Sequence, residues 1–319
     1  MNGRYQARLV STPLGARLAG PSAVGRVHSV FRGALNLELG GDLVTLAGPS
    51  VGALPNGMVL EADVDFSDLG LVAGMAVEGV RDGGALSVDG GRLVVDLRAA
   101  SAWSPRLARG TLRARHLDQV TQHLATALAR APATGGFAPL LGLLAHGVAW
   151  PIDGLPRTCA TAYPAIKRLL AGARAGNLHV ALDGARGLIG LGEGLTPSGD
   201  DLLVGFSAGL RAVASPLDPG LARACAQLAS GRTTRVAEVF LAHAARGEYS
   251  ARIHRLVHVL SVGSARVPSA VGVVRAASAE ATAGGAVSLA DELSLALRWG
   301  ASSGADTLLG VLLGGGMRT

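Results

Sequence analysis

Hydrophobic and polar residues alternate along the first third of the chain, in short runs that are broken by turn residues. Two of the clearest runs are GRVHSVFRGALNLELGG and GMVLEADVDF. Asp82-Gly83-Gly84 and Asp89-Gly90-Gly91 add hairpin signals between later runs. Many short strands at such close spacing are typical of a small barrel or sandwich. We therefore predict a β-rich domain over residues 1–115.

The hydrophobic period changes to that of a helix from about His116 onward. In HLDQVTQHLATALARA the apolar positions 117, 120, 124 and 128 fall on one helical face. Further helices are predicted at 162–175, 178–189, 200–214, 219–229, 233–246, 250–260, 266–283, 288–298 and 305–313. Residues 116–319 are thus expected to form a larger, mainly helical domain, which makes the fold class α+β.

One uncharged stretch, APATGGFAPLLGLLAHGVAWPI at residues 131–152, is long enough to cross a membrane. Its three prolines, four glycines and histidine favour a buried helix around Pro139–His146 with loops on either side. The N-terminal residues lack the continuous apolar segment of a signal peptide. Cys159 and Cys225 are the only cysteines and lack CxxC spacing. We expect a cytoplasmic protein with no membrane partner.

Charge is the one aspect of composition that bears on partners. The 319 residues carry a net charge of +6, but the basic residues are almost all scattered arginines. Aromatic residues make up only 3% of the chain, so few side chains are available to stack on bases. Nucleic acid is therefore not an expected partner. Small anionic ligands, or an acidic partner subunit, fit this charge at least as well.

The stretch GLGEGLTPSGDDLLVGF, residues 190–206, crowds glycines and acidic residues at the start of a predicted helix. Glycines allow positive φ and close approach of a ligand, a hydroxyl can cap the helix, and its first N–H groups suit phosphate or carboxylate. Asp200 and Asp201 could instead hold Mg²⁺ or orient a substrate amide. The alternative is a plain glycine-rich turn whose aspartates only complement the helix dipole. The candidate binding residues are Gly192, Gly194, Thr196, Ser198 and Gly199.

An internal repeat links this stretch to the end of the chain. Residues 198–205 and 303–310 share the pattern S-G-x-D-x-L-x-G, in which Ser303, Gly304 and Asp306 match the first copy. A chance match is the alternative, because the chain is rich in Ala, Gly and Leu. If the match is real, it predicts two related loop-to-helix turns that face each other across one pocket.

SGRTTRVAEVF, residues 230–240, is a second entry into a predicted helix. Arg232 and Arg235 flank Thr233 and Thr234, and guanidinium groups beside a helix N-terminus can clamp phosphate. A capped helix with solvated arginines is the alternative interpretation. His254 and His258 have the i,i+4 spacing of a metal site, but no carboxylate is near them in sequence, so a solvated or packed pair is expected. No metal ligands are assigned.

GLGEGLTPSGDDLLVGF resembles the signature G-x-G-x-G-L-T-P-S-G-D-D-x-L-x-G of a bacterial family long regarded as a domain of unknown function. That family includes a subunit of the oxamate carbamoyltransferase of allantoin degradation. RVHSVFRGALNL, SAWSP, TTRVAEVFLAHAARGEYS and GASSGADTLLGVLLG also fit the family pattern. The closing motif of the carbamoyltransferase branch is G-H-T-S-G-x-D, whereas Ala301 and Ser302 stand in that region here.

The resemblance implies a carbamoyltransferase subunit that acts on oxamate or a related amide with carbamoyl phosphate, in nitrogen or purine catabolism. Partner subunits of a transferase complex are implied as well. A non-catalytic ligand-binding or regulatory subunit and a Mg²⁺-dependent phosphotransferase are the alternatives. No cofactor is certain, and Mg²⁺ is the one considered. The resemblance places Thr196, Ser198, Gly199, Asp200 and Asp201 in a site, with Ser303, Gly304 and Asp306 as its second half. With the residues argued above, the candidate catalytic residues are Asp200, Asp201 and Asp306; the candidate substrate-binding residues are Gly192, Gly194, Thr196, Ser198, Gly199, Arg232, Thr233, Thr234, Arg235, Ser303 and Gly304.

Overall fold

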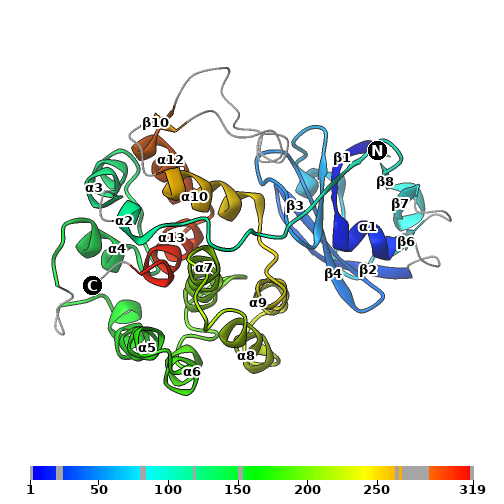
Figure 1. Ribbon diagram of the computed structural model, residues 1–319. Helices are drawn as coiled ribbons and strands as arrows, with labels where there is room; N and C mark the ends of the chain where they lie inside the picture. The colour runs from blue at the N-terminus through cyan, green and yellow to red at the C-terminus, as the bar shows by residue number, and fades with distance from the viewer. Residues whose placement is uncertain are drawn as a thin grey trace. The chain divides into compact units, whose positions relative to one another are not determined.

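The computed structural model describes residues 3–18, 24–79, 84–117, 120–149, 154–262, 266–267 and 287–316. The chain divides into two compact units, one built around strands and the other around helices. Figure 1 shows the order of the elements from the N- to the C-terminus. The predicted α+β class, with a small β unit followed by a larger helical one, is confirmed.

Within the described residues, the β unit is a closed barrel of eight strands. They are β1 (Gly3–Ser11), β2 (Val24–Val30), β3 (Ala34–Leu39), β4 (Asp42–Ala47), β5 (Gly57–Leu60), β6 (Ala76–Gly79), β7 (Ala85–Val88) and β8 (Leu93–Asp96). The hydrogen-bonded order is β5-β4-β3-β2-β6-β7-β8-β1, and pairing of β5 with β1 closes it. β9 (Ser101–Trp103) adds to β1 in parallel. Closure removes free strand edges, and leucines and valines such as Leu37, Leu86 and Val95 fill the interior.

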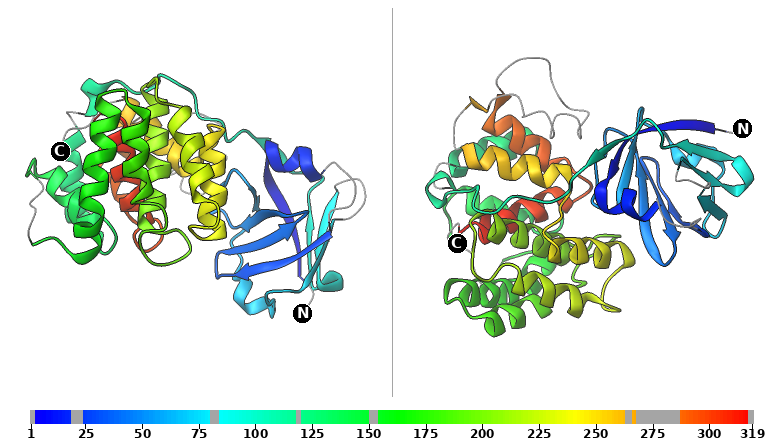
Figure 2. Two further views of the ribbon diagram at one scale, coloured as in Figure 1. Left: turned by 90° about the horizontal axis from the view of Figure 1, so that it is seen from below. Right: turned by 45° about the vertical axis from the view of Figure 1, so that its right-hand side comes forward.

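The helical unit is built around one buried pair of helices. Its elements are α2 (Ala114–Leu117), α3 (Val120–Arg130), α4 (Ala138–Ala145), α5 (Arg157–Arg174), α6 (Leu178–Arg186), α7 (Ser198–Ala212), α8 (Gly220–Ala229), α9 (Arg235–Ala245), α10 (Ala251–Val262), α12 (Leu289–Leu297) and α13 (Ser303–Gly314). α7 and α13 lie side by side in the middle, with the other helices around them (Figures 1 and 2). Residues 304–314 of α13 are all buried, as expected for a helix that is apolar on every side.

Glycines bring α7 and α13 into backbone contact, and the contact is reciprocal. A Cβ added at Gly205 would lie 2.2 Å from the Thr307 carbonyl oxygen, and one added at Gly310 would lie 2.2 Å from the Leu202 carbonyl oxygen. Gly205 and Gly310 match in the repeat, as do Leu202 and Thr307. Any larger residue at either glycine would therefore push the helices apart. The repeat is a structural one, in which two matched helices pack through matched positions.

Several sequence predictions need correction. The α7 N-cap is Pro197 and makes no side-chain cap hydrogen bond, so neither Thr196 nor Ser198 caps this helix. The helix predicted at 162–175 begins earlier, at Arg157. Of the helix predicted at 266–283, residues 266–267 form strand β10 (Arg266–Val267), paired with β11 (Val287–Ser288), and the rest lies outside the described residues.

The uncharged stretch at 131–152 forms the predicted buried helix. It appears as the eight-residue helix α4, with Leu140 and Leu141 fully buried. Among the described residues, no helix is long and apolar enough to cross a membrane.

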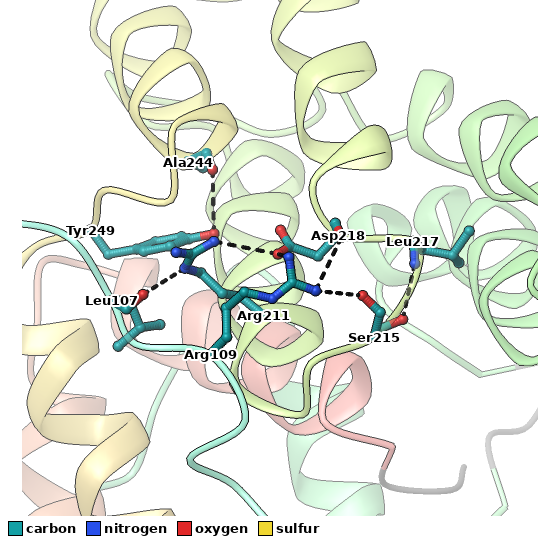
Figure 3. Close-up of polar contacts among 8 residues, drawn as sticks. All are labelled: Leu107, Arg109, Arg211, Ser215, Leu217, Asp218, Ala244 and Tyr249. Carbon is teal, nitrogen blue, oxygen red and sulfur yellow. Dashed lines mark hydrogen bonds and ion pairs between the residues drawn. The ribbon is translucent and has the colours of Figure 1, made fainter.

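A buried ion cluster holds the segment before α2 against the helices (Figure 3). Asp218 Oδ2 lies 3.4 Å from one guanidinium nitrogen each of Arg109 and Arg211. Arg211 Nε also donates to the Leu107 carbonyl oxygen over 2.6 Å, and Arg109 donates to that of Ser215 over 3.2 Å. Burial raises the pKa of Asp218, and the two arginines oppose that shift. The cluster thus neutralises a buried charge while it satisfies loop carbonyls.

Candidate functional site

The two repeated turns meet at the N-terminal ends of α7 and α13. The Thr196 and Ser303 hydroxyl oxygens, one from each turn, are 3.0 Å apart. In each turn a backbone N–H is bonded internally: the Gly199 N–H donates to the Leu191 carbonyl oxygen, and the Gly304 N–H donates to the Trp299 carbonyl oxygen. The two turns therefore lie side by side, and a shared pocket between them stays a prediction. These two N–H groups are used inside the turns, so they are not free to bind an oxyanion.

Asp201 and Asp306 are buried where the turns meet. Asp306 is fully buried and Asp201 is 8% exposed. The Oδ2 atom of each has no hydrogen-bond partner among the described residues. In the same part of the chain no arginine, lysine or histidine pairs with either carboxylate. Two acidic groups are therefore buried together without a compensating cation, an arrangement that ordinarily costs stability.

Burial dominates the acidity of both groups. It raises the pKa of Asp201 well above its ordinary value; hydrogen bonds from Ser303 and Thr196 oppose this shift, and the charges of Asp306 and Asp200 add to it. Burial likewise raises the pKa of Asp306 to about 6, against hydrogen bonds from Phe137, Ser198 and Ser302. Perturbed carboxyl groups of this kind gather at functional sites more often than elsewhere.

The loop before α4 supplies the rest of the site. The Phe137 N–H donates to Asp306 Oδ1 over 2.7 Å. Gly136 has a φ of 49°, and a Cβ there would lie 2.6 Å from both carboxylate oxygens of Asp306. Only glycine fits this approach. The Cys159 thiol, on α5, donates to the Gly136 carbonyl oxygen over 3.4 Å and so connects this loop to α5.

Asp200, although adjacent to Asp201, serves a different set of groups. Its carboxylate accepts the Gly190 N–H at 3.2 Å and the Thr233 hydroxyl at 2.5 Å. Burial raises its pKa, and these two donors oppose the shift. Asp200 therefore ties the glycine-rich loop to the entry of α9.

The remaining sequence-predicted residues lie around these turns. Gly192 packs against the start of α7, since a Cβ there would lie 2.7 Å from the Ser198 nitrogen. Gly194 is exposed and has a φ of 90°.

At the entry of α9, Thr234 caps the helix, and its hydroxyl donates to the Leu195 carbonyl. Arg232 is exposed, and Arg235 pairs with Glu238 at 3.3 Å. The structure thus brings Thr196, Ser198, Asp201, Ser303 and Asp306 together and leaves the two arginines outside that group.

Sequence reasoning missed the loop that completes the site. Gly136, Phe137 and Cys159 carry no motif, and Phe137 is 169 residues away from its partner in sequence. The one available signal was the adjacent pair Gly135-Gly136 before an apolar helix, which is typical of a loop with positive φ. Among the described residues no group of three or more His, Cys, Asp or Glu side chains could hold a metal ion.

A cavity of about 620 Å³ lies at the other ends of the central helices. Its lining includes Leu170, Arg174, Leu210, Leu313 and Gly316, which stand at or beyond the C-terminal ends of α5, α7 and α13. None of the site residues above lines it. The chemistry of the buried carboxylates, and not the size of this cavity, identifies the candidate site.

The fold and the site define a class: a small β-barrel joined to a helical unit that buries two repeat-related aspartates at paired helix N-termini. Residues 6–102 match the model of the AllH family N-terminal domain, and residues 188–315 match the model described as oxamate carbamoyltransferase subunit AllH. The chain therefore belongs to the AllH family. No curated protein and no solved structure matched it.

Proposed function

We propose that this chain is a carbamoyltransferase subunit in which Asp201 and Asp306 bind an amide-bearing reactant, such as oxamate. The observation that carries the proposal is a pair of buried carboxylates with unbonded Oδ2 atoms and no cation beside them. Both aspartates lie within the residues that match the oxamate carbamoyltransferase subunit model. Buried carboxyl oxygens without partners need hydrogen-bonding groups from a ligand, and an amide supplies both an N–H and a carbonyl oxygen.

The same surroundings argue against phosphate at the pair. A phosphate group would meet two acidic side chains and no guanidinium group there. The phosphate of carbamoyl phosphate would instead lie at the entry of α9, where Arg232 and Arg235 stand on either side of Thr233 and Thr234. Asp200 connects the two places through its bond to Thr233.

In this arrangement carbamoyl transfer proceeds as follows. The amide nitrogen of the acceptor attacks the carbamoyl carbon, a C–N bond forms, and the C–O bond to phosphate breaks. The nitrogen loses a proton to a carboxylate while phosphate leaves with the bonding electrons. Asp306 suits the role of base, because burial raises its pKa to about 6, closer to neutrality than an ordinary aspartate. Positioning of the two reactants supplies much of the remaining acceleration.

The family description names a subunit, which supports partner chains in the working transferase. Two alternatives lead to different observations. A non-catalytic binding subunit would bind oxamate alone and show no turnover in any complex. A phosphotransferase would bind nucleotide in a Mg²⁺-dependent way, with or without oxamate.

Calorimetric titration of the full chain with oxamate and with carbamoyl phosphate tests the proposal. Asp306→Asn should lower oxamate affinity by about 1.5–3 kcal/mol, the range for a hydrogen bond to a charged group. Asp183→Asn is the matched control, since the ion pairs of Asp183 with Arg168, Arg186 and His179 lie at the surface of α5 and α6, and this variant should bind like the wild type. Wild-type affinity in Asp306→Asn would contradict the proposal, as would oxamate binding that survives only with Mg²⁺ present.

A further inference from the structure

Asp201 and Asp306 cannot both be ionised without compensation. They approach closely enough for the charge of Asp306 to raise the pKa of Asp201, and both are at least nine-tenths buried. The groups that face them come from four parts of the chain. They are Asp200 and the Ser198 hydroxyl on α7, the Thr196 hydroxyl in the loop before α7, Ser302 and Ser303 at the start of α13, and the Phe137 N–H in the loop before α4. Cys159 on α5 is near Asp306 and adds no positive charge. Two adjacent buried like charges force one of them to take a proton.

The surroundings of the two carboxyl groups differ in a way that assigns the proton. Hydroxyl groups hydrogen-bond both carboxyl groups, those of Ser198 and Ser302 in the case of Asp306. Asp306 Oδ1 has in addition the Phe137 N–H, a group that can donate a hydrogen bond but never accept one. This partner favours the ionised form of Asp306. Asp201 is hydrogen-bonded by the Ser303 and Thr196 hydroxyls, which also contact each other at 3.0 Å. A hydroxyl can turn from donor to acceptor, so this end of the pair can receive a carboxylic-acid O–H.

We propose that the ligand-free pair holds a single proton at neutral pH and that Asp201 carries it. Asp201 is then a hydrogen-bond donor and Asp306 is an acceptor. The site presents one of each, although the sequence places an aspartate at both matched positions of the repeat.

This assignment deepens the proposed function and, where it concerns substrate, rests on it. A primary amide offers a carbonyl oxygen to accept a bond and an N–H to donate one. Neutral Asp201 matches the carbonyl oxygen, and ionised Asp306 matches the N–H. The pair of Asp201 and Asp306 therefore discriminates against a carboxylate group, because a carboxylate has no hydrogen-bond donor. It also discriminates against an ammonium group, because an ammonium has no acceptor. The reactant class is therefore a neutral amide end, with any charge of the molecule held elsewhere.

Infrared difference spectroscopy of the full chain tests the assignment without any substrate. Wild type minus Asp201→Asn, at neutral pH, should show the C=O stretch of one protonated carboxyl group. Wild type minus Asp306→Asn should show loss of an ionised carboxylate only. Asp200→Asn is the matched control at the neighbouring position, where an N–H and a hydroxyl already satisfy the charge, and it too should lose only a carboxylate signal.

Three outcomes would overturn the assignment. They are a protonated band lost in Asp306→Asn instead of Asp201→Asn, no protonated band in the wild type, and loss of that band when Mg²⁺ is added. If Asp201→Asn fails to fold, the wild type alone decides the question: raising the pH above neutrality must convert one protonated carboxyl group to carboxylate. A protonated band together with no oxamate binding would reject the proposed function and leave the assignment standing.

Discussion

Buried carboxylates in the helical unit have two opposite kinds of surroundings. Asp218 lies 3.4 Å from a guanidinium nitrogen of each of two arginines, and these also hold loop carbonyls (Figure 3). Glu292 is paired in the same way, with Arg255 at 2.6 and 2.7 Å. Asp201 and Asp306 are buried to a similar degree and have no cation beside them.

The comparison indicates which feature sets the proposed ligand site apart from a structural ion cluster. An unbonded carboxylate oxygen does not, because Asp218 Oδ1 lacks a partner just as the Oδ2 atoms of the pair do. The feature that does distinguish the pair is the lack, among the described residues, of a cation beside Asp201 and Asp306. A carboxylate paired with arginine serves the fold, whereas a buried one without a cation costs the fold stability, which is why we propose that a ligand binds there.

The largest effect should follow from breaking the neutralised cluster. Asp218→Ala leaves Arg211, whose side chain is 12% exposed, as an uncompensated buried charge. The free energy of unfolding should fall by about 3–5 kcal/mol in urea denaturation. Asp306→Asn, which removes a charge that has no counterion, should leave stability at pH 7 unchanged or higher. Equal losses in the two variants would erase the distinction between the two kinds of carboxylate.

The next effect is the pH dependence of stability. Asp306 has a pKa of about 6 in the folded chain, raised by burial from its ordinary value of 3.8. A group that holds its proton more tightly when folded stabilises the protein fully below pH 3.8, and this contribution is lost as the pH rises through 6. The difference in unfolding free energy between Asp306→Asn and wild type should therefore grow in favour of the variant between pH 4 and 7, by roughly 2–3 kcal/mol. A difference that stays constant over that pH range would show that ionisation of Asp306 does not destabilise the folded chain.

A smaller effect should come from the helix contact that holds the turns together. Gly310→Ala forces a methyl group against the Leu202 carbonyl and should cost about 1–3 kcal/mol of stability. The reciprocal change, Gly205→Ala, should cost about the same. Gly142→Ala, inside α4 with no atom within 4 Å of an added Cβ, is the control and should stabilise by up to about 1 kcal/mol. If thermal or urea unfolding finds the central substitutions as harmless as the control, the packing account fails.

Local patterns predicted much of this molecule. The period of 3.6 residues located most helices within a few residues, and alternation indicated several of the strands but not β1 or β4. The repeat also held an unused signal: Asp306 matches Asp201, while Asp200 matches Ala305, so the repeat already separated the two adjacent aspartates. Helix starts were placed two residues late at α7 and α13, because Ser-Gly was read as loop.

Apart from the meeting of the two repeated turns, the long-range contacts could not be predicted. The closure of the barrel depends on the pairing of β1 with β5, which no local pattern encodes. Phe137 reaches Asp306 only after α4 and α13 have packed, and a backbone N–H leaves no trace in the sequence. The cation that neutralises Asp218 comes partly from Arg109, more than 100 residues away, so the contrast between the carboxylates appears only in the folded chain.

The most direct test of the central claim, that the cation-free pair binds the amide reactant, is a crystal structure of the full chain with oxamate. We expect the oxamate nitrogen within hydrogen-bond distance of Asp306 Oδ2 and the amide carbonyl oxygen beside Asp201. Oxamate held at Arg232 and Arg235, with neither aspartate in contact, would contradict the claim and place the ligand site at the entry of α9.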